Sequence, residues 1–273
     1  LRLSYRVNLE ALEQDMAQRM QGLARMGSTT VAEAQAKEVA FARLRRDESS
    51  WRQARLAADL WTAAFFLPIT FDGSETVPRT DDVRAALAGQ DGATLRTSAT
   101  RRVADRLRFF HWPLEFADVA VRGGFDVVLG NPPWEKTKLE EQQFFANRDP
   151  QVASASNQAR RRRMIEALAT RNPALLAEFQ EAKHATEADA KFVRESGRFP
   201  LSGVGDLNTY ALFAELGHGL VGSQGRLGMV LPTELATGYT YRRFFATLTA
   251  EKSVVSLFDQ GVVVGGSASW SHL

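Results

Sequence analysis

The sequence of 273 residues predicts an α/β protein with a helical amino-terminal region and a helical insertion in its sheet. A short apolar, β-branched run at residues 125–129 is typical of a buried parallel strand. Helical periodicity fills the chain before this run, and strand patterns return only near the end of the chain. We therefore divide the chain into a helical region (1–112), a strand with the turn after it (113–145), an Arg-rich helical insertion (146–203) and the remaining α/β part (204–273).

The amino-terminal region is expected to contain five helices. Leu9 and Leu23 delimit a series of apolar residues at spacings of three and four, and Gly27 follows as a helix stop. Asp81 and Asp82 suit the start of a short helix, because carboxylates stabilise the positive end of a helix dipole. After the first helix, the expected helices cover residues 31–46, 50–66, 83–87 and 98–110.

The part of the chain after residue 204 is expected to alternate between helices and strands. Asp206 suits the start of a helix, and Gly225 is expected to turn the chain after that helix. An apolar run that ends before Pro232 has the character of a second buried strand. The expected order is a helix at 206–220, a strand at 227–231, a helix at 241–248 and a strand at 254–258.

The turn after the first expected strand carries the most informative residues of the sequence. Gly130 ends the strand, and Pro132 and Pro133 exclude the residues around them from a helix or a strand ladder. This places Asn131 and Trp134 at the carboxyl end of a parallel strand, where open α/β sheets form their ligand crevices. A rigid turn with a core tryptophan is the structural alternative. The combination of strand, glycine, asparagine and two prolines favours a functional site.

These residue types suit the activation of a planar amine. The exocyclic amine of adenine is a poor nucleophile, because its lone pair is delocalised into the ring. Two acceptors on its two hydrogens would concentrate that lone pair on nitrogen. Asn131 offers a side-chain carbonyl and Pro132 a backbone carbonyl on a stiff chain. Trp134 offers a flat face for stacking an extruded base, which contributes roughly 1–3 kcal/mol per base.

Residues 131–134 (Asn-Pro-Pro-Trp), after an apolar strand and a glycine, resemble the catalytic motif of amino-group methyltransferases that use S-adenosylmethionine. More narrowly, they are similar to the motif of the large adenine-N6 DNA methyltransferases of restriction–modification and BREX-type phage-defence systems. The lead-in at residues 111–116 is similar as well. The resemblance covers about residues 105–145 and 203–260, and it is more specific for reaction type than for substrate.

The resemblance implies a Rossmann-like class I methyltransferase sheet, partial in this chain, and site-specific methylation of adenine N6 in double-stranded DNA. A target adenine would be flipped from the duplex and stacked on Trp134. Its amine would be held by Asn131 and the Pro132 carbonyl and would attack the sulfonium methyl of S-adenosylmethionine in line. Pro133 would fix the angle at which Trp134 leaves the turn.

The resemblance also implies two cofactor-binding features that the sequence does not show. The family binds S-adenosylmethionine through a Gly-rich turn after its first strand and an acidic residue at the end of its second. Neither feature occurs upstream of residue 125, so the cofactor-binding residues stay unassigned. The chain begins at Leu1 rather than Met and leaves no room for a target-recognition domain at its end. We therefore expect the central part of a methyltransferase, inactive on its own.

Four consecutive arginines in the insertion are candidates for contacts to DNA. They point in different directions on a helix, so they cannot all be buried. A solvated helix face is the alternative interpretation. A cluster of arginines about thirty residues after a base-binding motif nevertheless suits a DNA backbone. The candidate DNA-binding residues are Arg160, Arg161, Arg162 and Arg163.

Composition excludes several other classes of protein. The 34 basic and 32 acidic residues give a net charge of +2, which neither requires nor excludes nucleic acid. The lack of cysteine excludes disulfides, zinc ribbons and thiol catalysis. The four histidines have no metal-ligand spacing, so no metal site is expected, and no apolar run is long enough to span a membrane. With no secretory signal, we expect a cytoplasmic protein that works with other subunits or domains of a defence system.

Two alternatives remain open at this point. The first is an amino-group methyltransferase that acts on RNA or on a protein glutamine, because these substrates also present a planar amine or amide. The second is a non-catalytic DNA-binding subunit of a defence complex. The missing cofactor motif favours the non-catalytic subunit, whereas the intact Asn-Pro-Pro-Trp motif favours an enzyme. The recognition sequence, an associated nuclease and the oligomeric state cannot be derived from these residues.

Overall fold

The computed structural model describes residues 6–47, 49–69, 76–90, 94–259 and 271–272. Within it the chain forms two compact units. Unit 1 contains residues 1–127 and 220–226, and unit 2 contains residues 128–219 and 227–273. The units are described separately below. The four stretches into which the sequence was divided stay a prediction.

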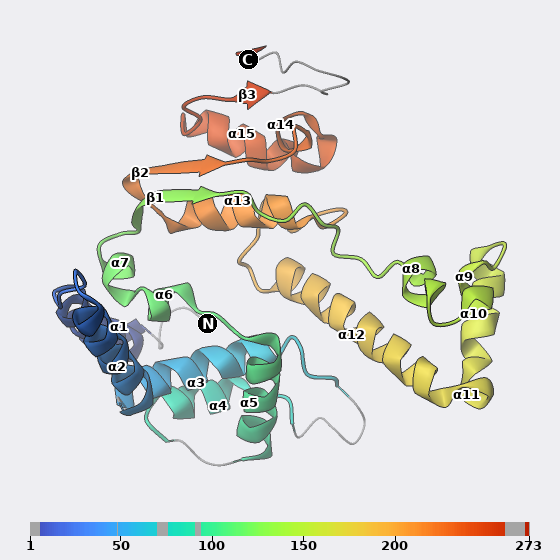
Figure 1. Ribbon diagram of the computed structural model, residues 1–273, viewed down its shortest axis with the longest axis horizontal. Coiled ribbons are helices and arrows are strands. Elements are labelled where there is room, and N and C mark those ends of the chain that lie inside the picture. Colours follow the sequence, from blue (N-terminus) through green and yellow to red (C-terminus); the bar gives the residue numbers. More distant parts are fainter. Residues whose placement is uncertain (1–5, 48, 70–75, 91–93, 260–270, 273) are drawn as a thin grey trace. The chain divides into compact units, whose positions relative to one another are not determined.

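Unit 1 is built almost entirely of helices, as the sequence predicts. The five expected helices all form, and the structure adds two short ones before the first strand (Figure 1). The helix expected at 83–87 begins earlier than predicted, because the Asp82 carboxylate accepts the Arg79 N–H at 2.7 Å and caps it. The helices are α1 Arg6–Ala24, α2 Val31–Asp47, α3 Ser49–Ala63, α4 Thr80–Leu87, α5 Leu95–Leu107, α6 Trp112–Glu115 and α7 Ala117–Val121.

The core of unit 1 brings the amino-terminal helices against the segment that leads to the motif. Met16 of α1 and Trp51 of α3 are buried together with Leu114 of α6 and Ala117 of α7. A second cluster joins Leu60 of α3 to Ala86 of α4 and Ala57. Burial of these apolar side chains, at about 25 cal/mol per Å² removed from water, stabilises the unit.

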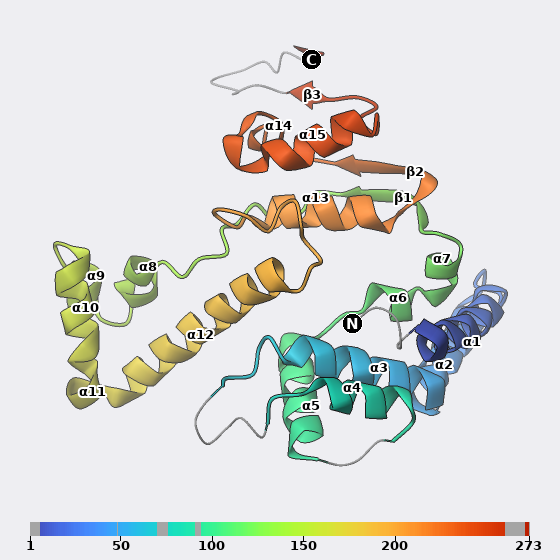
Figure 2. The same ribbon diagram turned by 180° about the vertical axis from the view of Figure 1, so that it is seen from behind.

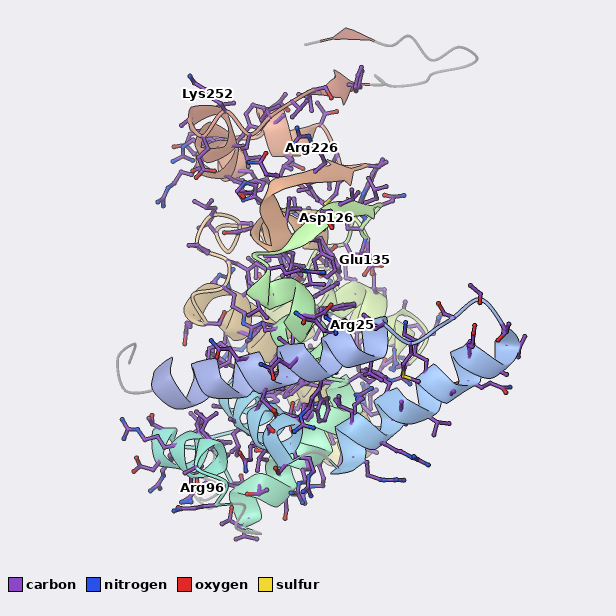
Figure 3. All side chains as sticks on the ribbon, turned by 90° about the vertical axis from the view of Figure 1, so that its left-hand side faces the viewer. Arg25, Arg96, Asp126, Glu135, Arg226 and Lys252 are labelled. Carbon is purple, nitrogen blue, oxygen red and sulfur yellow. The ribbon has the colours of Figure 1, made fainter. Side chains whose placement is uncertain are left out.

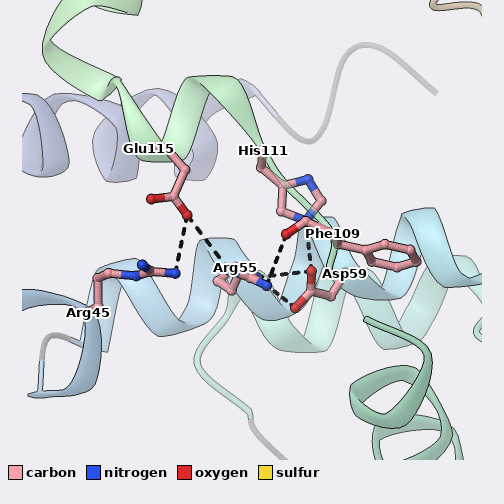
Figure 4. A network of polar contacts seen from close by, with 6 residues as sticks. All are labelled: Arg45, Arg55, Asp59, Phe109, His111 and Glu115. Carbon is pink, nitrogen blue, oxygen red and sulfur yellow. Dashed lines mark hydrogen bonds and ion pairs between the residues drawn. The ribbon is translucent and has the colours of Figure 1, made fainter. Parts of the chain in front are cut away.

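A network of charged side chains lies in the same packing (Figure 4). Asp59 accepts hydrogen bonds from Arg55 Nε at 2.9 and 3.0 Å, and its Oδ1 lies 2.7 Å from His111 Nε2. Arg55 also donates to the Phe109 carbonyl at 3.3 Å. Glu115 lies 3.8 Å from Arg55 Nη1 and within reach of Arg45. The network therefore ties α3 to the chain on both sides of His111.

Replacing Asp59 with alanine is expected to destabilise the protein by about 3–5 kcal/mol, because it leaves buried groups without their charged partner. The side chain of Asp59 is only 10% exposed, and that of His111 only 5%. Asp81→Ala is the matched control, since Asp81 is 89% exposed in its pair with Arg84 and such pairs contribute up to about 1 kcal/mol. Urea denaturation of both variants measures the difference. Equal midpoints would contradict a structural role for the network.

The described residues include one parallel strand pair, and each of its two strands has residues in both units. Strands β1 (Phe125–Gly130) and β2 (Val221–Met229) are hydrogen-bonded and run in the same direction (Figures 1 and 2). This mixed, mainly helical structure with a small parallel sheet is consistent with the predicted α/β class. The larger Rossmann-like sheet stays a prediction.

The second strand begins earlier than the sequence suggested. It was expected at 227–231, but β2 starts at Val221, directly after the helix α13 (Thr209–Leu220). Gly225 therefore lies inside the strand and does not turn the chain. A Cβ at Gly225 would lie 2.4 Å from the Phe125 carbonyl oxygen, so the glycine permits close approach of the two strands.

The expectation that the first strand is buried on both faces was wrong. Leu129 is 78% exposed and Val127 is 56% exposed. Helix α13 packs against β2, where its Gly217 lies against Leu227 and Met229. Within the described part of the chain, β1 has one strand neighbour, β2, which is too little to bury both faces of a strand.

The helical insertion forms a core of its own within unit 2. Short helices gather at the amino-terminal end of the long helix α12 (Figure 2). Phe145, Leu168 and Phe179 are buried at their centre together with Val152 and Leu175. The predicted insertion is helical, and its longest element, α12, is one helix of 23 residues. The helices are α8 Glu141–Ala146, α9 Pro150–Ala153, α10 Gln158–Glu166, α11 Leu168–Arg171 and α12 Pro173–Glu195.

The rest of unit 2 packs on α13. Tyr210 and Ala214 of α13 are buried with Leu235, Tyr241 and Phe244. The strand expected at 254–258 is mostly absent, since only Phe258–Asp259 forms a strand (β3), paired antiparallel with β4 (Ser271–His272). The remaining elements are α14 Glu234–Thr237, the 3₁₀ helix η1 Tyr239–Tyr241 and α15 Arg242–Ala250. Among the described residues, no helix combines the length and the apolar character needed to cross a membrane.

Candidate functional site

The Asn-Pro-Pro-Trp turn lies directly after β1, as the sequence predicts. Gly130 is the last residue of the strand, and its carbonyl accepts the N–H of Val230 at 3.1 Å. Pro132 is buried, whereas Asn131 and Trp134 are exposed. Trp134 is 54% exposed. The turn therefore presents an amide and an indole outward while one proline anchors it to the protein.

The start of α13 holds this turn in place. The Thr209 hydroxyl donates to the Pro133 carbonyl at 2.6 Å and accepts the Glu135 N–H at 3.0 Å. The Thr209 N–H in turn donates to the Glu135 carbonyl at 2.9 Å. One threonine thus fixes the backbone on both sides of Trp134. We call these three hydrogen bonds of Thr209 to Pro133 and Glu135 the clamp.

The clamp continues as a short antiparallel pairing. Lys136 forms an isolated bridge with Asn208, and the Thr137 N–H donates to the Leu207 carbonyl at 2.9 Å. The exit of the motif is therefore paired with the chain that enters α13. In Figure 3, the labelled Glu135 lies at this exit, beyond the end of β1.

A buried polar cluster supports the entry to α13. Asn208 Nδ2 donates to the Tyr241 hydroxyl at 2.8 Å and to the Asp206 carbonyl at 3.2 Å. The Tyr241 hydroxyl donates to the same carbonyl at 3.1 Å, and Tyr241 is fully buried. Such satisfied buried bonds fix one conformation of the segment, because breaking any of them leaves a polar group without a partner.

A second tyrosine, Tyr210, links α13 to the start of α14. The Tyr210 hydroxyl donates to Glu234 Oε2 at 3.1 Å. Burial, together with nearby Tyr241 and Glu234, raises the pKa of Tyr210 well above its usual range. The hydroxyl therefore stays protonated at physiological pH and remains a donor.

The clamp leaves the two acceptors proposed for an amine free. Among the residues that the structure describes, no hydrogen bond engages the Asn131 side chain or the Pro132 carbonyl. The next carbonyl along the chain, that of Pro133, is occupied by Thr209. Two neighbouring acceptors of the turn are therefore available to a ligand, whereas the third, the Pro133 carbonyl, is already hydrogen-bonded.

Nothing in the sequence marks Thr209 as part of the site. It lies near the start of the helix expected at 206–220, where a threonine is an ordinary residue. A hydroxyl in the first turn of a helix is a weak signal, because it does not identify a hydrogen-bond partner 76 positions away in the sequence. The role of Thr209 follows only from the three-dimensional structure.

The four arginines of the insertion lie on α10 and differ in their surroundings. Arg161 is buried, its Nη1 lies 3.8 Å from Glu141, and its Nε has no hydrogen-bond partner among the described residues. Arg162 pairs with Glu166 at 3.1 Å on the surface. Arg160 and Arg163 are exposed. Three of the four arginines are therefore on the surface.

Two cavities among the described residues do not fit S-adenosylmethionine. The cavity beside the motif exit has a volume of about 210 Å³ and is lined by three cationic side chains, Lys136, Lys138 and Arg194. Pockets for ligands of that size usually span about 300–1,000 Å³ and are mostly apolar. A second cavity of about 280 Å³ lies among α3, α4 and α5 in unit 1, and no residue of β1 or β2 lines it.

Comparison with known proteins supports a methyltransferase of restriction–modification type. Residues 59–163 match the family described as Eco57I restriction-modification methylase. The matched segment begins at Asp59, contains the Asn-Pro-Pro-Trp turn and ends at Arg163. Searches of curated proteins and of solved structures gave no match.

Proposed function

We propose that this chain takes part in S-adenosylmethionine-dependent methylation of the N6 amine of adenine in DNA, within a restriction–modification or phage-defence system. The match to a restriction-modification methylase supports DNA methylation as the reaction. The choice of adenine rests on the turn after β1. Double-stranded DNA as partner, further subunits of a defence system and a cytoplasmic location belong to the same proposal.

The observation that carries the proposal is the pair of free acceptors at the turn. Asn131 and the Pro132 carbonyl are unengaged among the described residues, while Thr209 occupies the Pro133 carbonyl. An adenine amine has two N–H bonds, one for each acceptor. Accepting both draws the nitrogen lone pair out of the ring and makes the amine a better nucleophile. The clamp fixes both acceptors before the substrate arrives, so little reorganisation is needed during the reaction.

Trp134 suits the adenine ring itself. A base must leave the duplex before its amine reaches a protein site, and stacking on an aromatic side chain offsets part of the cost of unstacking. Trp134 is 54% exposed and follows the two acceptors directly. Pro133 restricts the backbone between acceptor and stacking face, which sets the angle between them.

The proposal assigns the amine-holding part of the reaction to this chain. S-adenosylmethionine is the cofactor that the methylase family implies. Because neither of the two cavities described above fits it, no residue is assigned to cofactor binding and no step is derived through the cofactor.

The proposal also includes Arg160, Arg162 and Arg163 as contacts to the DNA backbone. Replacing all three with alanine should make the dependence of log K on log[salt] shallower by about 1 for each phosphate contact that is lost. Arg161 is left unchanged, because it is buried in the insertion. Fluorescence anisotropy with a duplex at several salt concentrations measures the slope. An unchanged slope would remove these arginines from the proposal.

The reaction is tested by transfer of labelled methyl from S-adenosylmethionine to duplex DNA, using the longest natural polypeptide that contains this sequence. Nuclease digestion and chromatography should place the label in N6-methyladenine. Label in RNA or in protein glutamine would change the substrate and keep the amine chemistry. Lack of transfer to any of the three would overturn the proposed activity and favour a non-catalytic DNA-binding subunit.

A further inference from the structure

A cationic cavity lies beside the exit of the motif. It is bounded by the segment after Trp134, by the carboxyl-terminal turns of α12 and by the chain that enters α13, all within unit 2. Its volume is about 210 Å³. The side chains with charge along its wall are Lys136, Lys138, Glu187, Arg194 and Asp206.

The three cations of this cavity are only lightly engaged. Lys136 is exposed, and the described residues include no ion-pair partner for it. Lys138 Nζ lies 3.9 Å from Glu140, but the two side chains are 69% and 52% exposed, and such pairs contribute little. Arg194 donates to the Gly205 carbonyl at 3.0 Å and keeps further guanidinium N–H groups for another partner.

The two acids of the cavity do not cancel this charge. Glu187 lies 3.9 Å from Lys183, which stands outside the cavity wall. Asp206 is the second acid, and its backbone carbonyl is occupied by Asn208 and Tyr241. With three cations against two acids, one of which has an outside partner, the wall favours an anion.

The same backbone pairing positions the motif and the cavity. Thr209 holds Glu135, and the next bridge joins Lys136 to Asn208. Lys136 follows Trp134 by two residues, which span at most about 7 Å. Phosphates of one DNA strand recur about every 3.4 Å along the helix axis. A base stacked on Trp134 would therefore bring a phosphate of its own strand within reach of the lysine side chain.

We propose that Lys136, Lys138 and Arg194 bind one phosphodiester of the DNA strand that carries the target base, an inference that rests on the proposed function. The contact carries no sequence information and fixes the register of the strand at the turn. The ligand chemistry is a phosphate group. Free inorganic phosphate shares it, so the experiment compares the two sources.

The test measures the salt dependence of duplex binding for Lys136→Gln/Lys138→Gln in the longest natural polypeptide. Both side chains are exposed, so the variant should keep its fold, which circular dichroism verifies. Arg194 is left unchanged because it also bonds to Gly205. Loss of one phosphate contact should make the slope of log K against log[salt] shallower by about 1. If the double variant fails to fold, Lys136→Gln alone gives the same test.

Lys252→Gln is the matched control for the single variant Lys136→Gln, which is measured beside the double variant, because both remove one positive charge from an exposed position in the same unit (Figure 3). Its slope should equal that of the unmodified protein. An equal change in Lys252→Gln and Lys136→Gln would overturn the inference, since net charge alone would explain the effect.

Three other outcomes are informative. An unchanged slope in the cavity variant, in a protein that methylates DNA, would overturn this inference and leave the proposed function intact. A protein that neither binds nor methylates DNA would overturn both. Thermal stabilisation by inorganic phosphate that is lost in the variant, with an unchanged DNA slope, would assign the cavity to free phosphate and overturn the DNA contact.

Discussion

Replacing Asn131 with alanine is expected to lower the rate of methyl transfer by about 10²–10³-fold, the range seen when one preorganised hydrogen-bonding group is removed from a reacting centre. The substitution deletes one of the two acceptors on the adenine amine. Asn131 is exposed and makes no hydrogen bond among the described residues, so the fold should be unaffected. Single-turnover transfer of labelled methyl to duplex DNA measures the rate, and urea denaturation verifies stability.

Asn147→Ala is the matched control for this prediction. Asn147 is also exposed, lies in unit 2 and follows α8 at its carboxyl-terminal end. Its replacement should leave the transfer rate within about two-fold, as expected for a surface change away from any site. An Asn131→Ala enzyme that retains the unmodified rate would refute the role of the turn in amine activation, whatever the substrate.

Replacing Thr209 with valine is expected to lower the rate constant for methyl transfer by about 10–100-fold, because displacement of a catalytic group by about 1 Å can cost 10²-fold. Valine has nearly the same shape but lacks the hydroxyl that bonds to Pro133 and Glu135. The variant also frees the Pro133 carbonyl, which then competes with the Pro132 carbonyl for the amine. The change should appear in single-turnover experiments at saturating DNA.

Thr209→Ser separates positioning from packing. Serine keeps the hydroxyl and loses a methyl group, so it should restore most of the rate although it makes the packing looser. The stability of the valine variant should fall by about 1–3 kcal/mol, the cost of leaving a partly buried polar group without its bond. If serine and valine lower the rate equally, the hydroxyl does not position the turn. If the valine variant loses stability alone, Thr209 has a structural role only.

The Asn131 and Thr209 predictions both concern the methyl-transfer step, but the two residues act on it in different ways. Asn131 would touch the substrate, whereas Thr209 acts through the backbone of the turn. Combining Asn131→Ala with Thr209→Val should therefore cost less than the product of the two separate effects, because a misplaced turn matters little once its acceptor is gone. Independent, multiplicative effects would indicate that Thr209 supports something other than the placement of these acceptors.

Much of the secondary structure followed from the sequence alone, because it depends on local interactions. The five helices before residue 110 formed where apolar spacing and helix-favouring residues indicated them. The turn at residues 131–134 lies at the carboxyl end of β1 because two consecutive prolines lack the N–H groups that would continue a strand ladder. The match to a restriction-modification methylase agrees with the reaction type inferred from these few residues.

The errors arose where a long-range contact overrides a local signal. The sequence predicted a turn at Gly225. The residue instead lies inside β2, where the Phe125 carbonyl approaches too closely for a side chain. The apolar pattern predicted buried side chains for Val127 and Leu129, but both are exposed, because the exposure of a strand depends on its neighbours in space. Which of the four arginines is buried was likewise not given by the sequence, and the fold of the insertion buries Arg161.

The sequence by itself determined the chemistry that the turn offers, since an amide, a carbonyl on a stiff backbone and an indole are properties of the residue types. Only the tertiary structure decided which carbonyls remain free and what holds them. Thr209 and Pro133 are 76 positions apart, and nothing local to either predicts their bond. The cationic cavity likewise combines three segments that the sequence keeps apart. Sites of this kind form when folding brings distant backbone groups together, which residue types and spacing do not encode locally.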